Sequence, residues 1–159
     1  MTVAAVGAKL ALYLVNLPQE KMAMYTIFML LLVILVGSFF TVRKFKMISS
    51  DIDMKSLVKA GMKSTTLFAV FMGIFVFIYY SYIDTHYFPD LIADRIELAK
   101  AAAVENPDIN LENVQKMGEM WFSPKTHATF TLFGLTVAGA IYSFFISLFM
   151  RKVRGFGKN

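Results

Sequence analysis

The sequence contains no cysteine among its 159 residues. This absence excludes disulfides, thiolate catalysis and metal centres held by cysteine sulfur. Charged residues make up only 17% of the chain, whereas a soluble domain of this size carries about 25%. Because 57% of the residues are hydrophobic, the composition excludes both an ordinary soluble globule and a disordered chain.

Signatures of enzymes and cofactor sites are also missing. The chain has no P-loop, no glycine-rich dinucleotide fingerprint, no HExxH pattern and no Ser-His-Asp order. Its two histidines, His86 and His127, lie far apart in sequence and do not form a metal-ligand pattern. The sequence therefore predicts a protein with no enzymatic activity, no metal and no cofactor.

Three long runs without charge are what the sequence does contain. They cover residues 22–42, 64–83 and 126–150, with 21, 20 and 25 residues. About 20 apolar residues suffice to cross the hydrocarbon core of a membrane as a helix. Each run predicts a membrane-spanning helix. None holds a carboxylate or a proline, which argues against an ion-coupled transporter with broken helices.

A fourth apolar stretch, residues 2–17, is shorter and carries Lys9. Sixteen residues of helix rise roughly 24 Å, less than the roughly 30 Å of the hydrocarbon core. It either spans a thinned bilayer or packs as a short helix against the others. The expected fold is an all-α integral membrane four-helix bundle, a single membrane domain over residues 1–159, with a short first helix.

The charges predict the orientation. Residues 43–63 and the tail after 150 hold ten of the sixteen basic residues, whereas residues 84–125 hold eight acids and four bases. The positive-inside rule places the basic loop and the C-terminus in the cytoplasm and residues 84–125 outside. We expect four crossings, which put the N-terminus in the cytoplasm, as Lys9 also favours; three crossings would put it outside. This pattern also accounts for the basic pI without a nucleic-acid partner.

Two segments lie outside the predicted spans. The cytoplasmic loop 43–63 is predicted to form an amphipathic helix, and its Lys55, Lys59 and Lys63 are candidate contacts for anionic lipid. A solvated basic face that only sets topology is the favoured alternative. Residues 84–125 predict a helical hairpin, whose second helix carries an apolar stripe of Leu111, Val114, Met117 and Met120. Aromatic residues at its ends predict an interfacial belt: Tyr79, Tyr80, Tyr82, Tyr87, Phe88, Trp121 and Phe122.

Lys9 and the small residues are the remaining candidates for function. A lysine inside a membrane helix is costly and marks a candidate polar site, unless the side chain extends to the cytoplasmic interface, which we favour. Small residues at four-residue spacing are typical of close helix packing. These candidate seams join helices within one bundle or bind another protein; their residues are Ala69, Gly73, Gly139, Ser143 and Ser147.

The order of these features is similar to a known pattern. Lys59-Ala60-Gly61 precedes the third run, Pro89 follows its tyrosines, and Ser123-Pro124 precedes a last run closed by Arg151-Lys152. The chain resembles a family of small four-span bacterial membrane proteins classed as a domain of unknown function. The resemblance implies a bacterial inner membrane and a helical bundle, and it supplies no activity, ligand or functional residue.

Two functions follow as expectations. The leading one is a non-enzymatic accessory or assembly subunit of a larger inner-membrane complex, with membrane lipids and other membrane subunits, or further copies of the chain, as partners. The alternative is a small uncoupled transporter or lipid- or anion-binding membrane protein that uses Lys9.

Overall fold

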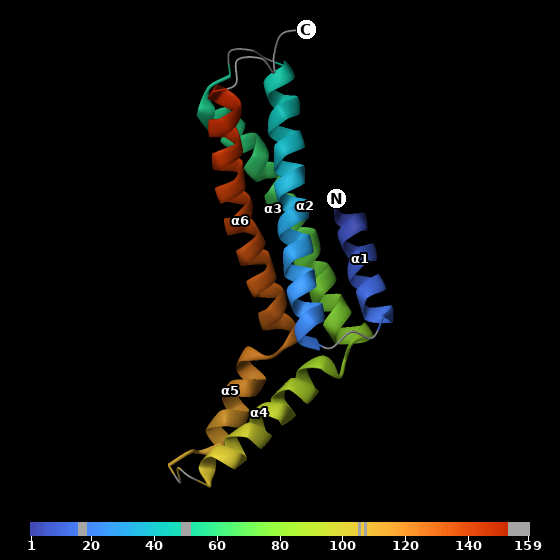
Figure 1. The fold of residues 1–159 in the computed structure, drawn as a ribbon, viewed down its shortest axis with the longest axis vertical. Coiled ribbons are helices and arrows are strands. Elements are labelled where there is room, and N and C mark those ends of the chain that lie inside the picture. Colours follow the sequence, from blue (N-terminus) through green and yellow to red (C-terminus); the bar gives the residue numbers. More distant parts are fainter. Residues whose placement is uncertain (16–18, 49–51, 105, 107, 153–159) are drawn as a thin grey trace. The chain divides into compact units, whose positions relative to one another are not determined.

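The computed structural model describes residues 1–15, 19–48, 52–104, 106 and 108–152 (Figure 1). Regular structure in these residues is helical, which confirms the all-α class. The elements are α1 (Thr2–Leu14), α2 (Gln19–Ile48), α3 (Met54–Ile78), the π-helix η1 (Tyr79–Ile83), α4 (Tyr87–Ala103), α5 (Leu111–Trp121) and α6 (Pro124–Lys152).

Three of the described helical segments are long and apolar enough to cross a membrane. They cover Met24–Ile48, Met54–Ile83 and Pro124–Lys152, with 25, 30 and 29 residues. Each extends beyond its uncharged run, because lysine and arginine favour helix and can carry their charges to the interface on long stems. The predicted basic loop is correspondingly short. Most of residues 43–63 belong to the end of α2 and the start of α3.

The first helix, α1, is only 13 residues long, which corresponds to about 20 Å of helix. It lies against α2, and the side chain of Met1 occupies the space beside Gly37. The crossing expected at residues 2–17 is therefore not confirmed. Of the two alternatives, the short packed helix fits the described structure, because α1 falls well below the thickness of the hydrocarbon core.

The chain divides into two compact units. The first unit combines Met1–Met72 with Leu132–Asn159, and the second is Gly73–Thr131. In the first unit α2, α3 and α6 run side by side as a helical bundle (Figure 1). Its described core includes Val42, Leu57, Ile146 and Met150. The Lys46 ammonium donates to the carbonyl of Met150, which ties the end of α2 to α6.

In the second unit α4 and α5 pack against each other as a helical hairpin. The amide of Asn113 donates to Asn110 Oδ1 over 3.1 Å, so Asn110 caps α5. Ser123 caps α6 in the same way through the amide of Thr126, at 3.2 Å. Pro124 then occupies the first helical position, where no N–H group is needed.

The apolar stripe predicted for α5 is half-buried at its N-terminal end and exposed at its C-terminal end. Leu111 and Val114 are half-buried, but Gly118 is the buried residue of α5, and Met117 and Met120 are 55% and 62% exposed. A Cβ atom on Gly118 would lie 3.4 Å from Ile92 Cγ2 of α4. The missing side chain therefore lets the two helices approach at Gly118. Because Gly118 faces α4, Met117 and Met120 point to other sides of α5.

Candidate functional site

Lys9 is almost completely buried, with 4% of its surface exposed. It lies one turn after Ala5, and these two are the buried residues of α1. The side chain is engaged by a noncovalent interaction within the described structure. A lysine that extends to the membrane interface would be exposed at its ammonium group. The burial of Lys9 therefore does not fit the interfacial interpretation and keeps Lys9 as a candidate polar site.

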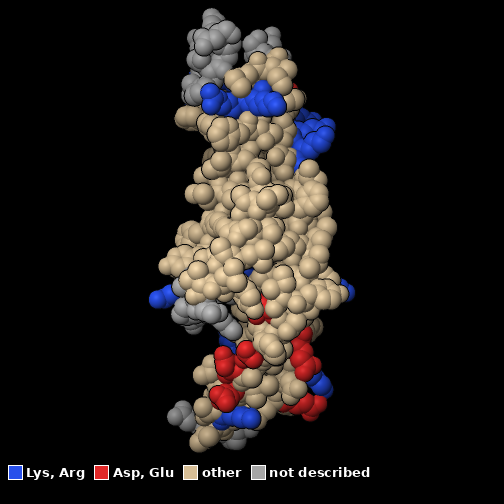
Figure 2. Space-filling model, turned by 90° about the vertical axis from the view of Figure 1, so that its right-hand side faces the viewer, with Lys and Arg blue, Asp and Glu red and all other residues tan. Residues whose placement is uncertain are grey.

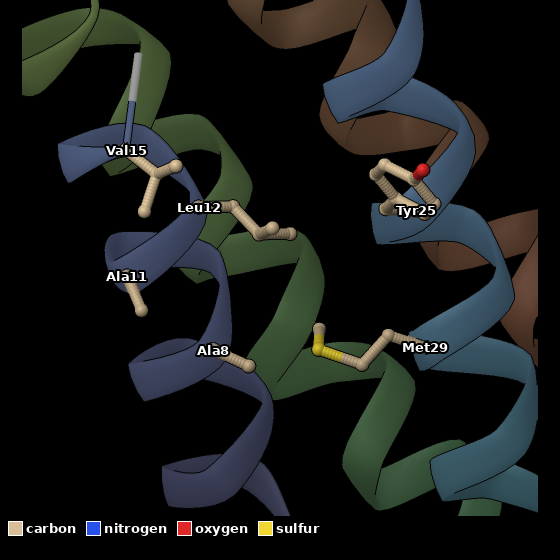
Figure 3. Close-up of a pocket in the computed structure, with 6 residues that line it drawn as sticks. All are labelled: Ala8, Ala11, Leu12, Val15, Tyr25 and Met29. Carbon is tan, nitrogen blue, oxygen red and sulfur yellow. The ribbon is translucent and has the colours of Figure 1, made fainter. Parts of the chain in front are cut away.

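A groove between α1 and α2 lies next to Lys9 and is almost entirely apolar. It has a volume of about 550 Å³. Figure 3 shows Ala8 and Leu12 of α1 and Met29 of α2 pointing toward one another across it. Lys9 is not among the lining residues, and the tyrosine hydroxyl is the single polar side-chain group in the lining. The groove suits an acyl chain better than a polar solute; its lining is Ala8, Ala11, Leu12, Val15, Tyr25 and Met29.

A second groove, between α2 and α3 in the first unit, brings two of the predicted lipid-contact lysines together. Lys59 and Lys63 both line it, whereas Lys55 does not. The hydroxyl of Thr41 donates to Ser64 Oγ over 3.2 Å and so joins the two helices at the groove. The volume is about 510 Å³, and the lining is Thr41, Phe45, Ser56, Lys59, Ala60, Lys63, Ser64 and Leu67.

The small-residue seams lie inside the helical units. Ala69, Gly139, Ser143 and Ser147 are buried in the first unit, and Gly73 is buried in the second. Gly139 of α6 lies against Thr65 of α3. The α6 seam therefore contacts another helix of the same chain at Gly139, in line with the intramolecular interpretation.

The aromatic cluster of the second unit is buried rather than arranged as a belt. Tyr80 is its centre, with ring centroids 4.8 Å from Tyr87, 4.9 Å from Phe88 and 5.2 Å from His127. Tyr79, Tyr80 and Phe88 are buried, so the belt interpretation is wrong for these three. It fits Tyr82, which is 77% exposed. These rings form the core of the second unit.

The π-helical turn η1 places the cluster. The amide of Asp84 donates to the carbonyl of Tyr79 over 2.9 Å, five residues back, and the Tyr79 hydroxyl donates to Asp84 Oδ2 over 3.4 Å. The wide turn lets the neighbours Tyr79 and Tyr80 both face inward. Burial, and secondarily the carboxylate of Asp84, raise the pKa of Tyr87. Sequence analysis missed this turn, because π-helices have no simple residue signature.

Among the described residues, no group of three histidine, aspartate or glutamate side chains is arranged to hold a metal ion. His127 instead contacts the aromatic cluster, with its ring 5.7 Å from that of Phe88. The structure therefore gives His127 a packing role in the second unit.

The exposed surface of the hairpin is mixed. Acidic side chains gather over α4 and α5 on the face shown in Figure 2, with a few basic ones among them. Met117, Met120 and Trp121 are exposed at i, i+3 and i+4 positions of α5. Trp121 stacks on Phe130 of α6, with centroids 5.9 Å apart. An apolar ridge on an acidic helix is the most distinctive surface of the second unit.

Helices of this length and hydropathy define an α-helical membrane protein with three candidate spans in its described part. The chain belongs to the family described as "Protein of unknown function (DUF4199)", whose model matches residues 1–152. This match confirms the resemblance to a domain of unknown function. No curated protein and no solved structure matches the chain.

Proposed function

We propose that the protein is a non-enzymatic accessory or assembly subunit of a larger complex in the bacterial inner membrane. The observation that carries the proposal is the apolar ridge of Met117, Met120 and Trp121 on α5. Met117 and Met120 are more than half exposed and Trp121 is half exposed, so the ridge is available for a further contact. Exposed apolar surface rimmed by polar residues is typical of interaction sites.

The partner that fits this surface is a membrane subunit with a basic, partly apolar extracytoplasmic face. Residues 84–125 carry eight acids and four bases, so the hairpin has a net negative charge of four. Complementary charge favours a basic partner and speeds its encounter with the hairpin. The methionines suit the centre of such a contact, because their side chains adapt to irregular apolar surfaces.

The proposed topology has three crossings. The basic ends of α2, α3 and α6 lie in the cytoplasm, the hairpin lies outside, and α1 is inserted beside α2 without crossing. The absence of cysteine makes this easy to test with single-cysteine variants and a membrane-impermeant maleimide. We expect Asn113→Cys on α5 to react in intact cells and Lys55→Cys to react only after permeabilisation. The reverse labelling pattern would contradict this orientation and place the hairpin in the cytoplasm.

The subunit role is tested by blue-native electrophoresis after mild detergent extraction. We expect a band larger than the chain, which is lost in the double variant Met117→Gln and Met120→Gln. A matched control, Ala102→Gln with Asn113→Gln, changes two exposed positions elsewhere on the hairpin and should keep the band. Rising salt should weaken the complex, because a basic partner is held partly by charge. A lone monomer under every extraction condition would reject the proposal.

A second candidate function is favoured by the burial of Lys9. A cation in a membrane helix, with 4% exposure, suits an uncoupled transporter or a lipid- or anion-binding protein. We expect Lys9→Met to abolish binding of inorganic phosphate and of phosphatidylglycerol vesicles while expression is unchanged. Lys21→Met, at an exposed position in α2, is the control. An unchanged binding curve for Lys9→Met rejects this candidate.

A further inference from the structure

The groove between α2 and α3 lies at the boundary between charged and uncharged sequence. Lys63 is the last charged residue before the uncharged run 64–83, and Thr41 lies one residue before the end of the run 22–42. Both line the groove. In a membrane this boundary corresponds to the level where lipid headgroups meet the hydrocarbon core. The groove therefore lies at the depth of a phospholipid phosphate and glycerol.

The two sides of this boundary carry different chemistry. Lys59 and Lys63 are exposed, one helical turn apart on α3, and supply ammonium groups at the rim. The hydroxyls of Thr41 and Ser64 lie beside them. Leu67, one turn deeper into the uncharged run, is 59% exposed and extends the groove with an apolar wall. Cationic and hydroxyl donors above an apolar wall match the order of groups in a phospholipid.

The charge around the groove is strongly positive. Arg43, Lys44, Lys46 and Lys55 lie near the same helix ends. The described acid among them is Asp53, whose pKa is lowered chiefly by a hydrogen bond from Ser56 and which stays a fixed single negative charge at neutral pH. Basic residues outnumber it, so the local field favours an anion.

We propose that this groove binds one anionic glycerophospholipid, with its phosphate between Lys59 and Lys63 and an acyl chain along Leu67. The proposal goes beyond the subunit role, because it needs neither the hairpin nor a protein partner. A lipid is favoured over a soluble phosphate because the apolar wall at Leu67, one turn below Ser64, would stay without a contact if the ligand had no hydrocarbon tail.

Native mass spectrometry in detergent tests the site, because micelles lack a charged bilayer surface and report retained lipid directly. The protein is supplied with phosphatidylglycerol and, separately, with phosphatidylcholine. We expect wild-type protein to retain phosphatidylglycerol preferentially. The variant Lys59→Gln with Lys63→Gln should lose at least about fivefold in retained lipid, the effect expected of a single lysine near anionic lipid.

The matched control is Lys44→Gln with Lys55→Gln, which removes the same charge outside the groove lining. It should retain lipid as the wild type does. Leu67→Trp fills the apolar end without changing charge and should lower retention too. Equal losses in the groove and control variants, or no loss in either, would overturn the site. Competition by soluble glycerol phosphate at the concentration of the lipid would overturn the choice of a lipid.

Discussion

Gly139 in α6 lies directly against Thr65 in α3. A Cβ atom on Gly139 would come within 2.5 Å of Thr65 Cβ and 3.2 Å of its methyl group. The threonine hydroxyl is held by its own helix, since it donates toward the carbonyls of Gly61 and Met62 at 3.2 and 3.1 Å. The side chain is therefore fixed, and the two helices meet where one of them has no side chain.

The first prediction concerns this contact. Gly139→Ala should lower the free energy of unfolding by about 1–3 kcal/mol, because the added methyl group overfills a closed space. Gly134→Ala is the control, since a Cβ atom there meets nothing within 4 Å. It should be neutral or stabilising by up to about 1 kcal/mol, as alanine favours helix over glycine. Unfolding by SDS titration in mixed micelles measures both. Equal effects of the two substitutions would contradict the packing.

A second close approach predicts coupling between two positions. A Cβ atom on Gly61 would lie 2.5 Å from Ser143 Oγ and 2.8 Å from Ser143 Cβ. We expect Gly61→Ala to destabilise the bundle and Ser143→Gly to relieve much of that loss in the double variant. The coupling energy should be about 1 kcal/mol or more, of the size seen for residues in contact. Strictly additive effects in the same SDS titration would show that the residues do not touch.

The third prediction separates the buried tyrosine from its exposed neighbour. Tyr80→Ala should cost about 3–5 kcal/mol, because it removes the central ring of the second unit. Tyr82→Ala, at a 77% exposed position, should cost less than about 0.5 kcal/mol. The single tryptophan, Trp121, lies in the second unit, so its fluorescence reports the unfolding of this unit. A melt that is equally sensitive to both substitutions would contradict the aromatic core.

The fourth prediction concerns alkaline pH. The folded state raises the pKa of Tyr87, first through burial and then through Asp84. The unfolded chain loses this proton at about pH 10, while the folded chain still holds it. The stability that Tyr87 contributes is therefore complete below about pH 10 and is lost as the pH rises through the folded-state pKa.

Absorbance of tyrosinate against pH, compared between the wild type and Tyr87→Phe, measures this titration. We expect Asp84→Asn to lower the pKa of Tyr87 only in part, because burial is the larger cause. Tyr87→Phe should also reduce the loss of stability above about pH 10. Titration of Tyr87 in folded protein at or below the ordinary value of about 10 would contradict the burial.

The sequence predicted the elements whose cause is local. The three long spans follow from uncharged runs of sufficient length. The exposure of Met117 and Met120 could not be predicted, because apolar spacing does not say which part of a stripe packs on a neighbouring helix. Here α4 approaches α5 at Gly118, which such a pattern ignores.

The grooves were beyond prediction for a different reason. The spacing of Lys59 and Lys63 made them candidate lipid contacts. Whether they line a groove depends on which face of α3 packs against α2, where Thr41 and Phe45 form the other side. That choice is made by packing between distant segments of the chain. The burial of Lys9 likewise depends on tertiary contacts, and a helix of 13 residues shows too little of a pattern to reveal it.

The π-helical turn η1 also changes the positions of later side chains around the helix axis. Its hydrogen bond joins residues five apart, so the turn contains one residue more than an α-helical turn. A helical wheel drawn with a constant period of about 3.6 residues through Tyr79–Ile83 therefore assigns later residues to the wrong side of the helix. Deleting one residue there would restore the regular period but rotate all that follows by about 100°. Asp84 would then move away from the Tyr79 hydroxyl, so the extra residue of this turn is what brings Asp84 back to Tyr79.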